Sequence, residues 1–303
     1  MKNLLVTGAF KISDEQKKII EGMGYNVYLH PDESHPLEID SKLIDGVICN
    51  NLFTYAPINN FKNLRFIQLT SAGTDRLDMD YAARNNIKVY NAKGVYSIPM
   101  SEFAVGGILQ LYKNFAFFNE NKKSKTWCKD RNLLELYGKR ACVIGTGSVG
   151  SEIAKRLNAF GVNVYGIDLH PRQDSDFVKI MPPDSLSEYI SQADIVILSL
   201  PLTERSFHFF GKTEFDKMKP GSVFVNIARG TLTEPNALID VLKSGKLCGA
   251  VLDVFEEEPL DESSPLWDME NVVLTPHNSF VGENNNRRLF ELIVSNLEIQ
   301  QGE

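Results

Sequence analysis

The 303-residue sequence is poor in cysteine and has no long apolar run. Its four cysteines are widely scattered and form no Cys-x-x-Cys pair, so nothing indicates a zinc site or a redox motif. No stretch approaches the roughly 18 consecutive apolar residues of a transmembrane helix, and the first ten residues lack the pattern of a secretory signal. We therefore expect reduced, mostly buried thiols, no metal, no membrane span and a cytoplasmic location.

An excess of positive charge is also lacking. The chain has 32 Lys and Arg against 39 Asp and Glu, for a net charge of -7. A surface that binds nucleic acid needs Lys and Arg clustered over a whole face. The longest basic cluster, Lys122, Lys123 and Lys125, lies in a polar stretch, 119–125, that we interpret as a solvated loop. Nucleic acid is therefore not an expected partner.

The sequence does contain two series of short β-rich runs that alternate with amphipathic stretches. The first comprises Leu4–Thr7, Val27–Leu29, Gly46–Cys49, Phe66–Leu69 and Lys88–Tyr90. The second comprises Ala141–Ile144, Val162–Ile167, Ile195–Leu200, Ser222–Ile227, Gly249–Val254 and Val272–Leu274. This rhythm predicts an α/β protein with parallel sheets, of which the second is doubly wound and Rossmann-like. A chain of this length favours two domains.

Two helices are expected outside these series. Residues Met100–Phe118 carry apolar side chains on so many sides that we predict one buried helix. Residues Glu283–Gln300 place apolar side chains at near-helical spacing, which predicts an amphipathic helix at the end of the chain.

A glycine-rich motif follows the expected strand Ala141–Ile144 and precedes a helical stretch. It consists of Gly145, Thr146, Gly147, Ser148, Val149 and Gly150. In a dinucleotide-binding turn the first glycine permits the tight bend, the second lets the pyrophosphate approach the backbone, and the third lets helix and strand pack closely. The helix N-terminus supplies N–H groups to the phosphates. A bare match could also be a strand-to-helix turn without a ligand.

Asp168 strengthens the dinucleotide interpretation. It ends the next expected strand, about twenty residues after the glycines, where a carboxylate accepts hydrogen bonds from the adenosine ribose. Because a carboxylate repels a 2′-phosphate, we predict NAD as the cofactor and consider NADP less favoured. Arg172 is the one residue that could weaken this preference, although we interpret it as a solvated loop arginine.

Three further residues follow successive expected strands of the second series. Arg229, Glu258 and His277 come after Ser222–Ile227, Gly249–Val254 and Val272–Leu274 respectively. Ligands of an open parallel sheet bind beyond the carboxyl ends of its strands. Reduction of a 2-keto acid needs a cation for the carboxylate and the developing oxyanion, and a proton donor. Arg229 fits the first role and His277 the second, while Glu258 would favour the charged imidazole and fix its tautomer.

Each of the three also has an ordinary interpretation. Arg229 could be a surface arginine, Glu258 one of a solvated acidic run and His277 a turn residue, but their placement on successive strand ends favours the catalytic hypothesis. We interpret the other histidines as surface or loop residues. They are His30, His35, His170 and His208.

Five motifs in one order resemble the D-isomer-specific 2-hydroxyacid dehydrogenase family, over nearly the whole chain. They are Ser71-Ala72-Gly73-Thr74-Asp75, Gly145 to Gly150, Asn226-Ile227-Ala228-Arg229-Gly230, Asp253 to Pro259 and Thr275-Pro276-His277. The resemblance implies a flavodoxin-like substrate-binding domain, residues 1–98 and 281–303, and an NAD-binding domain, residues 99–280. It also implies a cleft between them and a homodimer built on the nucleotide domain.

The same resemblance assigns individual residues. Arg229, Glu258 and His277 match the family's catalytic triad. The backbone of Ala72 and Gly73 is expected to contact the substrate carboxylate. The expected cofactor-binding residues beyond the glycine loop and Asp168 are Leu200 and Pro201 beside the adenine, Ala228, and Asp253 near the nicotinamide carboxamide. Asp253 could equally be structural. After His277 the chain departs from many relatives, because Asn278-Ser279-Phe280 replaces small apolar residues.

We therefore expect an NAD-dependent D-2-hydroxyacid dehydrogenase or 2-ketoacid reductase that acts on a small molecule. The alternative is a nicotinamide-responsive, corepressor-like binding protein with little turnover. Formate oxidation is disfavoured, because family members with that activity have an amide where this chain has Glu258. In residues Asn50–Pro57, the apolar side chains of Leu52, Phe53 and Tyr55 either face an uncharged substrate or pack on their own domain.

Overall fold

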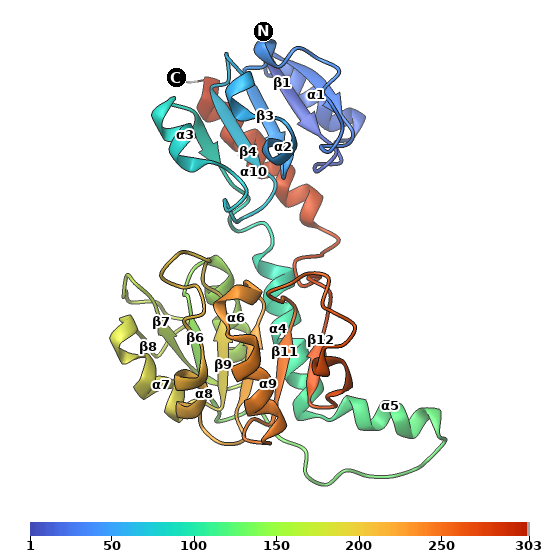
Figure 1. Cartoon of the computed structure of the whole chain (residues 1–303), viewed down its shortest axis with the longest axis vertical. Helices are drawn as coiled ribbons and strands as arrows, with labels where there is room; N and C mark the ends of the chain where they lie inside the picture. Colours follow the sequence, from blue (N-terminus) through green and yellow to red (C-terminus); the bar gives the residue numbers. More distant parts are fainter. Residues whose placement is uncertain (302–303) are drawn as a thin grey trace. The chain divides into compact units, whose positions relative to one another are not determined.

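The computed structural model describes residues 1–301, apart from the side chain of Gln301, and divides the chain into two compact units. The small unit comprises Met1–Tyr96 with Gly282–Glu303, and the large unit comprises Ser97–Val281. Residues 302 and 303, which end the expected substrate-binding segment, lie outside the described residues. Figure 1 shows that the last helix, in red, belongs with the blue strands of the small unit.

The small unit contains a five-stranded parallel sheet in the order β2-β1-β3-β4-β5. Its strands are β1 (Lys2–Thr7), β2 (Tyr25–His30), β3 (Gly46–Cys49), β4 (Phe66–Leu69) and β5 (Lys88–Tyr90). Its helices are α1 (Asp14–Gly22), η1 (Ser41–Leu43), α2 (Leu52–Tyr55), η2 (Ile58–Asn60), α3 (Met79–Arg84) and α10 (Asn285–Gln301). This strand order is that of flavodoxin-like sheets.

The C-terminal helix α10 is part of the small unit's core. Leu289, Ile293 and Leu297 recur every four residues, so they lie on one face of the helix, and all three are buried with the apolar residues of β1. Asn296 donates a hydrogen bond from its Nδ2 to the Oε1 of buried Gln68 at 2.6 Å. The final helix therefore packs on a sheet whose last strand ends almost 200 residues earlier in the chain.

The large unit contains a seven-stranded parallel sheet in the order β12-β11-β10-β9-β6-β7-β8. Its strands are β6 (Arg140–Ile144), β7 (Asn163–Ile167), β8 (Lys179–Met181), β9 (Ile195–Leu198), β10 (Val223–Asn226), β11 (Gly249–Leu252) and β12 (Val272–Leu274). Its helices are α4 (Ser97–Tyr112), α5 (Phe115–Lys123), α6 (Ser148–Ala159), η3 (Pro183–Ser185), α7 (Leu186–Gln192), α8 (Lys212–Lys217), η4 (Gly230–Leu232), α9 (Pro235–Lys243) and η5 (Pro265–Asp268). The expected doubly wound sheet is confirmed, and its order reverses between β6 and β9.

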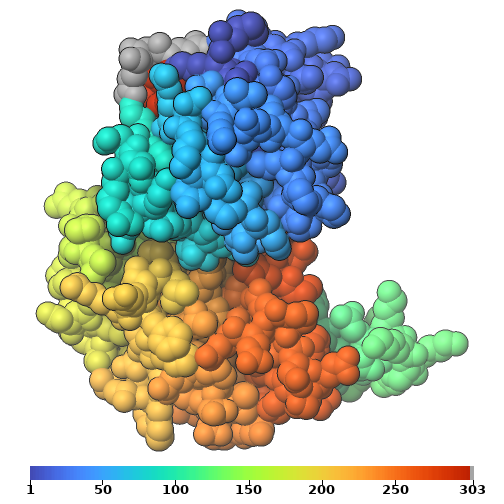
Figure 2. Space-filling view, turned by 45° about the horizontal axis from the view of Figure 1, so that its top comes forward, coloured from blue at the N-terminus to red at the C-terminus, as the bar shows by residue number. Residues whose placement is uncertain are grey.

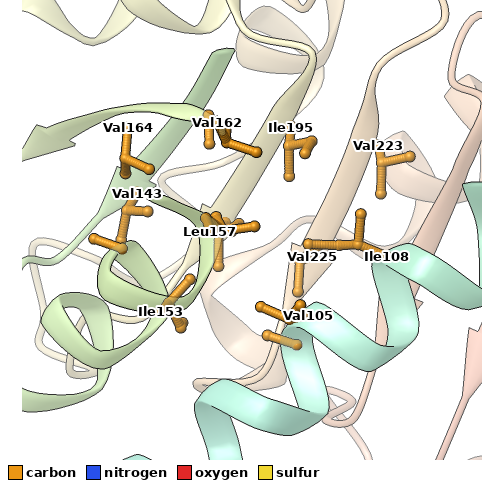
Figure 3. Packing of buried hydrophobic residues seen from close by; sticks show 14 of the residues in the cluster. Val105, Ile108, Val143, Ile153, Leu157, Val162, Val164, Ile195, Val223 and Val225 are labelled. Atoms are coloured by element: carbon orange, nitrogen blue, oxygen red, sulfur yellow. The ribbon is translucent and has the colours of Figure 1, made fainter. Parts of the chain in front are cut away.

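Helices α4 and α6 cover one face of this sheet. Figure 3 shows Val105 and Ile108 of α4 beside Val225 of β10, and Ile153 and Leu157 of α6 in the same apolar cluster. All five side chains are nearly or fully buried. This packing fixes the start of α6, and hence the glycine-rich turn, against the carboxyl end of β6.

The prediction of one buried helix over Met100–Phe118 is wrong. Helix α4 ends at Tyr112, and α5 begins at Phe115 after Asn114, whose φ of +49° is left-handed and interrupts the helical hydrogen-bond ladder. No residue of α5 is buried, and Phe115 is 51% exposed. The helix continues to Lys123, so most of the expected loop 119–125 is helical. Figures 1 and 2 show α5 projecting from the rest of the large unit.

The described residues contain no helix that is long and apolar enough to span a membrane, and no group of three or more His, Cys, Asp or Glu side chains placed to hold a metal. Cys49 and Cys142 are buried, and burial raises the pKa of Cys142 to about 12. Cys248 is half-buried, whereas Cys128 is exposed, in contrast to the expected buried thiol.

Candidate functional site

The glycine-rich turn is shaped by close backbone contacts on two sides. Gly145 has a φ of +92°, and a Cβ there would lie 2.7 Å from the backbone of Leu200. A Cβ on Gly150 would lie 2.1 Å from the carbonyl oxygen of Gly145. Neither position can carry a side chain without moving the backbone, because these contacts are far inside van der Waals distance.

Gly147 differs from the other two glycines. It is exposed, and a Cβ built on it would meet no atom of the described residues within 4 Å. It is also the N-cap of the 12-residue helix α6, where it supplies no side-chain hydrogen bond to the first turn. The N-terminus of α6 therefore presents N–H groups and a positive dipole end beside open space, which fits the pyrophosphate of a dinucleotide.

Asp168 follows β7 and is tied to the same turn. Its Oδ2 accepts hydrogen bonds from Thr146 N at 2.8 Å and from Thr146 Oγ1 at 2.9 Å, and its Oδ1 accepts one from His170 N at 3.0 Å. Burial raises the pKa of Asp168, but the three hydrogen bonds and the nearby Arg172 charge outweigh burial and hold that pKa below its usual value. The carboxylate is therefore ionised and fixed beside the glycine turn.

Arg172 lies in an exposed loop, as expected, but its guanidinium is also bonded to the glycine-rich turn. Its Nη1 donates to Thr146 Oγ1 at 2.8 Å, and its Nη2 donates to Thr146 O at 2.6 Å. The same Nη2 forms an ion pair with Asp174 at 3.1 Å. These hydrogen bonds could not be predicted from a local pattern, because Thr146 and Arg172 are 26 residues apart and meet only where β6 and β7 lie side by side.

The loop after β10 carries Ala228 and Arg229. Buried Asn226 organises it, since Asn226 Nδ2 donates to Arg229 O at 2.9 Å and Asn226 Oδ1 accepts from Ala228 N at 3.1 Å. Arg229 is half-buried, and its Nη1 donates to Ala228 O at 2.7 Å. Asparagine is well suited to such a turn because its short amide bonds the backbone two or three residues away.

Glu258 and His277 meet although they are 19 residues apart. His277 Nδ1 lies 2.8 Å from Glu258 Oε2, and the other carboxylate oxygen, Oε1, accepts from Phe255 N at 3.0 Å. Each side chain is 37% exposed. An ionised carboxylate can only accept, so Nδ1 carries the hydrogen in this pair and Nε2 is the ring atom left for a substrate.

Asp253 organises the turn that holds His277. Its fully buried carboxylate accepts hydrogen bonds from Thr275 Oγ1 and Asn278 N, both at 2.7 Å, and from Ser279 N at 2.9 Å. Its carbonyl oxygen accepts from His277 N at 2.7 Å. His277 has a left-handed φ of +51°, and these bonds stabilise that conformation. This geometry favours the structural role that the sequence left open for Asp253.

The strand order explains how far the expected triad is assembled. Strands β10, β11 and β12 are neighbours, so the loops that carry Arg229, Glu258 and His277 lie next to one another at one sheet edge. The loops after β10 and β11 are in backbone contact, because a Cβ on Gly230 would lie 1.9 Å from the carbonyl carbon of Phe255. Glu258 and His277 are directly bonded, and Arg229 is on the adjoining loop.

The loop after β9 contains Leu200 and Pro201. Leu200 is in close backbone contact with Gly145, and the chain that follows lines an open pocket of about 410 Å³. The pocket is lined by Leu202, Thr203, Glu204 and Phe207. Both expected adenine neighbours therefore lie at the same sheet edge as the glycine turn, across the switch point between β6 and β9.

Ala72 and Gly73 belong to the small unit, at the carboxyl end of β4. Three successive carbonyl oxygens of this loop accept hydrogen bonds: Ser71 O from Ala92 N, Ala72 O from Asn91 Nδ2, and Gly73 O from Ser71 Oγ, at 2.8–2.9 Å. These bonds hold the peptide planes, so the loop is fixed by its carbonyl groups.

The loop Asn50–Pro57 is only partly what we expected. Leu52 is fully buried in the small unit's core, and Phe53 packs edge-on against Phe61 with ring centroids 5.5 Å apart. The hypothesis of a substrate-facing apolar edge is therefore wrong for Leu52, and Phe53 packs on its own unit. Tyr55 remains 53% exposed.

Two of the four histidines that we interpret as surface or loop residues have specific partners. His30 is buried rather than exposed, with its Nε2 3.2 Å from His35 O. His208 forms a second imidazole–carboxylate pair at the carboxyl ends of the strands of the large sheet, with its Nε2 3.0 Å from Glu256 Oε2. The rule that ligand-binding residues follow strands would have found His208, because it lies in the loop after β9.

Comparison with known proteins agrees with this geometry. The sequence profile of "D-isomer specific 2-hydroxyacid dehydrogenase, NAD binding domain" matches residues 105–279. The chain is 36% identical over 222 residues, 73% of its length, to D-3-phosphoglycerate dehydrogenase from Methanocaldococcus jannaschii, of which the match spans only 42%. It is 34% identical over 241 residues to glyoxylate reductase from Thermofilum pendens, covering 78% of this chain and 71% of that enzyme.

A solved structure is similar over the whole chain. It is a D-isomer specific 2-hydroxyacid dehydrogenase from Xanthobacter autotrophicus in complex with NADPH and MES, 25% identical, with a TM-score of 0.82 and coverage of 100% of this chain and 96% of that one. The matched profile covers more than half of the present sequence, and it includes the glycine turn, Asp168, Arg229, Glu258 and His277. The chain belongs to the D-isomer specific 2-hydroxyacid dehydrogenase family, whose members are NAD(P)-dependent oxidoreductases.

Proposed function

We propose that this protein transfers a hydride between a nicotinamide dinucleotide and C2 of a small D-2-hydroxy acid or 2-keto acid. The observation that carries this proposal is the His277–Glu258 pair, 2.8 Å apart, on the sheet edge that also presents the open glycine turn. A general acid–base group beside a dinucleotide site is the combination that carbonyl reduction requires.

His277 is the acid–base residue of this mechanism. During reduction, C2 receives the hydride that a bound reduced nicotinamide supplies, and the C2–oxygen double bond becomes a single bond. His277 Nε2 gives its proton to the oxygen, which becomes a hydroxyl, and takes the proton back in the reverse reaction. Glu258 accepts the Nδ1–H, so it fixes the ring and stabilises the imidazolium that exists before proton transfer.

Arg229 holds and polarises the substrate. Its planar guanidinium can bind a carboxylate through two parallel hydrogen bonds, and its fixed charge stabilises the negative charge that develops on the oxygen bonded to C2. From the family resemblance we also propose that the backbone of Ala72 and Gly73, in the small unit, contacts the carboxylate of the substrate. The carbonyl bonds that fix this loop support the role, because a preorganised loop loses little entropy on binding.

The cofactor we propose is NAD, with NADP less favoured. Asp168 lies beside the glycine turn as an ionised carboxylate, which suits ribose hydroxyls and repels a 2′-phosphate. Leu200, Pro201 and Ala228 would line the rest of the dinucleotide site. The NADPH complex of the Xanthobacter relative shows that this fold also holds the phosphorylated cofactor, and Arg172 is the residue that would assist it here.

We propose a homodimer built on the large unit. Helix α5 and the segment after it expose large apolar side chains, among them Phe115 at 51% and Trp127 at 98%. No residue of α5 is buried within the chain. An exposed apolar arm of this kind indicates an interaction surface, and a second copy is the partner that the family resemblance favours.

The test is a spectrophotometric screen of the purified protein with NADH and about a dozen 2-keto acids, followed by His277→Ala. We expect NADH oxidation with at least one acid, and a loss of about 10²- to 10⁴-fold in turnover for His277→Ala. The dissociation constant for NADH should change little, because the role of His277 is proton transfer.

His35→Ala is the matched control, since His35 forms a similar pair with Asp32, at 2.9 Å, in the small unit. It should turn over substrate like the wild type. NADH binding without oxidation by any acid would contradict the enzyme and favour a nicotinamide-responsive binding protein.

A further inference from the structure

The large unit contains a second imidazole–carboxylate pair beside the first. His208 Nε2 lies 3.0 Å from Glu256 Oε2, and the two side chains are 28% and 34% exposed. The pair joins the loop after β9 to the loop after β11. The mechanism proposed above does not use either residue.

His208 is held in place by more than its contact with Glu256. The backbone N–H of His208 donates to Thr231 O, in the loop after β10, at 2.8 Å. The φ of His208, +50°, is left-handed. The ring stacks on Phe207 with centroids 4.0 Å apart and planes 20° from parallel. A left-handed histidine costs conformational energy, so these contacts must compensate for it. The imidazole is thereby fixed over two neighbouring strand-end loops.

Glu256 is two residues before Glu258 on the same loop. Glu258 is itself anchored at both oxygens, by His277 Nδ1 and by Phe255 N. The loop is therefore held on one side by His277 and on the other by His208. It also packs against Gly230, the residue after Arg229. Any shift of Phe255 or Glu256 would be transmitted to both Glu258 and the loop that carries Arg229.

The contact between His208 and Glu256 also affects which carboxylate pairs with His277. Glu256, Glu257 and Glu258 are consecutive acids that repel one another, and each could attract an imidazolium. His208 Nε2 lies 3.0 Å from Glu256 Oε2, so this carboxylate already has an imidazole partner. Glu258 is then the acid available to His277, in the geometry with Oε1 on Phe255 N.

We infer that His208 and Glu256 are positioning residues, which hold the loop after β11 so that Glu258 orients His277 and Arg229 stays beside them. Neither residue contacts the substrate in this scheme. The inference rests on the proposed function for its effect on turnover. Its effect on the geometry of His277 is independent of any substrate.

The experiment compares His208→Ala, Glu256→Ala and the double variant with the wild type, with His35→Ala as the matched control. Turnover of the best 2-keto acid should fall by about 10-fold or more in each single variant, as for residues coupled in one network. The double variant should lose no more than the single ones. His208→Gln, whose amide can replace the Nε2 donor, should recover most of the turnover, while NADH binding stays within about 3-fold of the wild type.

A second readout needs no substrate. The ring Nδ1–H proton of His277 is followed by NMR, assigned by its absence in His277→Ala. It should shift or broaden in His208→Ala and Glu256→Ala, and stay unchanged in His35→Ala. An unchanged signal together with wild-type turnover would overturn the inference. A variant that loses NADH binding and thermal stability along with turnover would also overturn it, because that result indicates general unfolding. If no 2-keto acid is reduced by the wild type, the proposed function fails and the NMR signal alone decides the inference.

Discussion

Asp168 and Arg172, which carry opposite charges, both form hydrogen bonds with Thr146 of the glycine-rich turn. Asp168 accepts two hydrogen bonds from Thr146, and Arg172 donates two hydrogen bonds to the same residue. The carboxylate favours ribose hydroxyls, whereas the guanidinium favours a 2′-phosphate. Because both are anchored to the glycine turn, the preference between NAD and NADP depends on their balance rather than on Asp168 alone.

We predict that Asp168→Ala narrows the preference for NADH over NADPH, and that Arg172→Ala widens it. Loss of a hydrogen bond to a charged group costs about 1.5–3 kcal/mol, so the ratio of the two dissociation constants should move by about 10-fold or more in each direction. Fluorescence titration with NADH and NADPH measures it. Asp174→Ala is the control that releases Arg172 from its ion pair and keeps both key charges. A ratio that stays constant across the variants would place specificity elsewhere.

Sequence reasoning located residues whose role follows from chain-local geometry. Gly145, Gly147 and Gly150 could be predicted because a strand–turn–helix with these spacings allows few other conformations. Their backbone geometry is as expected, whereas the fixed Arg172 and the His208–Glu256 pair were missed. Both arise from contacts between loops 26 and 48 residues apart, which a local pattern does not encode.

At the scale of elements, Asp194 connects the amino ends of neighbouring strands of the large sheet, opposite the candidate site. It lies just before β9. Its Oδ2 accepts from Arg140 N at 2.9 Å, and its Oδ1 forms an ion pair with Lys219 Nζ at 2.7 Å. Burial raises the pKa of Asp194, but the Lys219 and Arg140 hydrogen bonds and the charges of Lys219 and Lys139 lower it further, so the net shift is downward. The side chain is only 16% exposed.

We predict that Asp194→Asn lowers the free energy of unfolding by about 1–3 kcal/mol at pH 7. The pKa of Asp194 is lower in the folded protein than in the unfolded chain. Its stabilisation is therefore complete above the unfolded value, near 3.8, and is lost as the pH falls through the lower, folded value. Urea unfolding between pH 7 and pH 3 should show the two proteins converging at the acid end.

Asp216→Asn is the control for this prediction. Asp216 also pairs with a lysine, Lys212 at 2.8 Å, but its side chain is 60% exposed, so its removal should change stability little. A wild type and an Asp194→Asn variant that remain equally far apart at pH 3 would contradict the assignment to this carboxylate.

The elements themselves were predictable where apolar runs are long. Strands such as β9, Ile195–Leu198, are buried on both faces and appear as uninterrupted β-branched and leucine runs. Strand β8 was missed because it has three residues, of which only Ile180 is buried. The break between α4 and α5 was missed because apolar residues continue past it, and the left-handed backbone at Asn114 has no strong signature in the sequence.

At the scale of the whole molecule, two alternating series of strands gave two sheets, and the final helix α10 returns to the first of them. The alternation of strands and helices predicts the sheets, because parallel strands need crossover connections. The return of α10 follows from the family resemblance only, since its amphipathic pattern would fit either unit.

The arm formed by α5 and residues 124–133 carries the last prediction. Trp127 is 98% exposed and Phe115 is 51% exposed, and full burial of one large apolar side chain contributes about 1.5–3 kcal/mol. A symmetric dimer buries each side chain twice, so Phe115→Ala with Trp127→Ala should weaken dimerisation by at least about 100-fold. Sedimentation velocity over a concentration series measures this.

Ile19→Ala with Leu29→Ala is the matched control, because both side chains are about half exposed in the small unit. The control should dimerise like the wild type, since a dimer built on the large unit leaves those residues in water. A wild type that is monomeric at all concentrations would refute the proposed dimer. Dimerisation that is unchanged in the Phe115→Ala, Trp127→Ala variant but weakened in the control variant would indicate an interface on the small unit. The reason is that a substitution weakens the dimer only where it removes apolar surface buried at the interface.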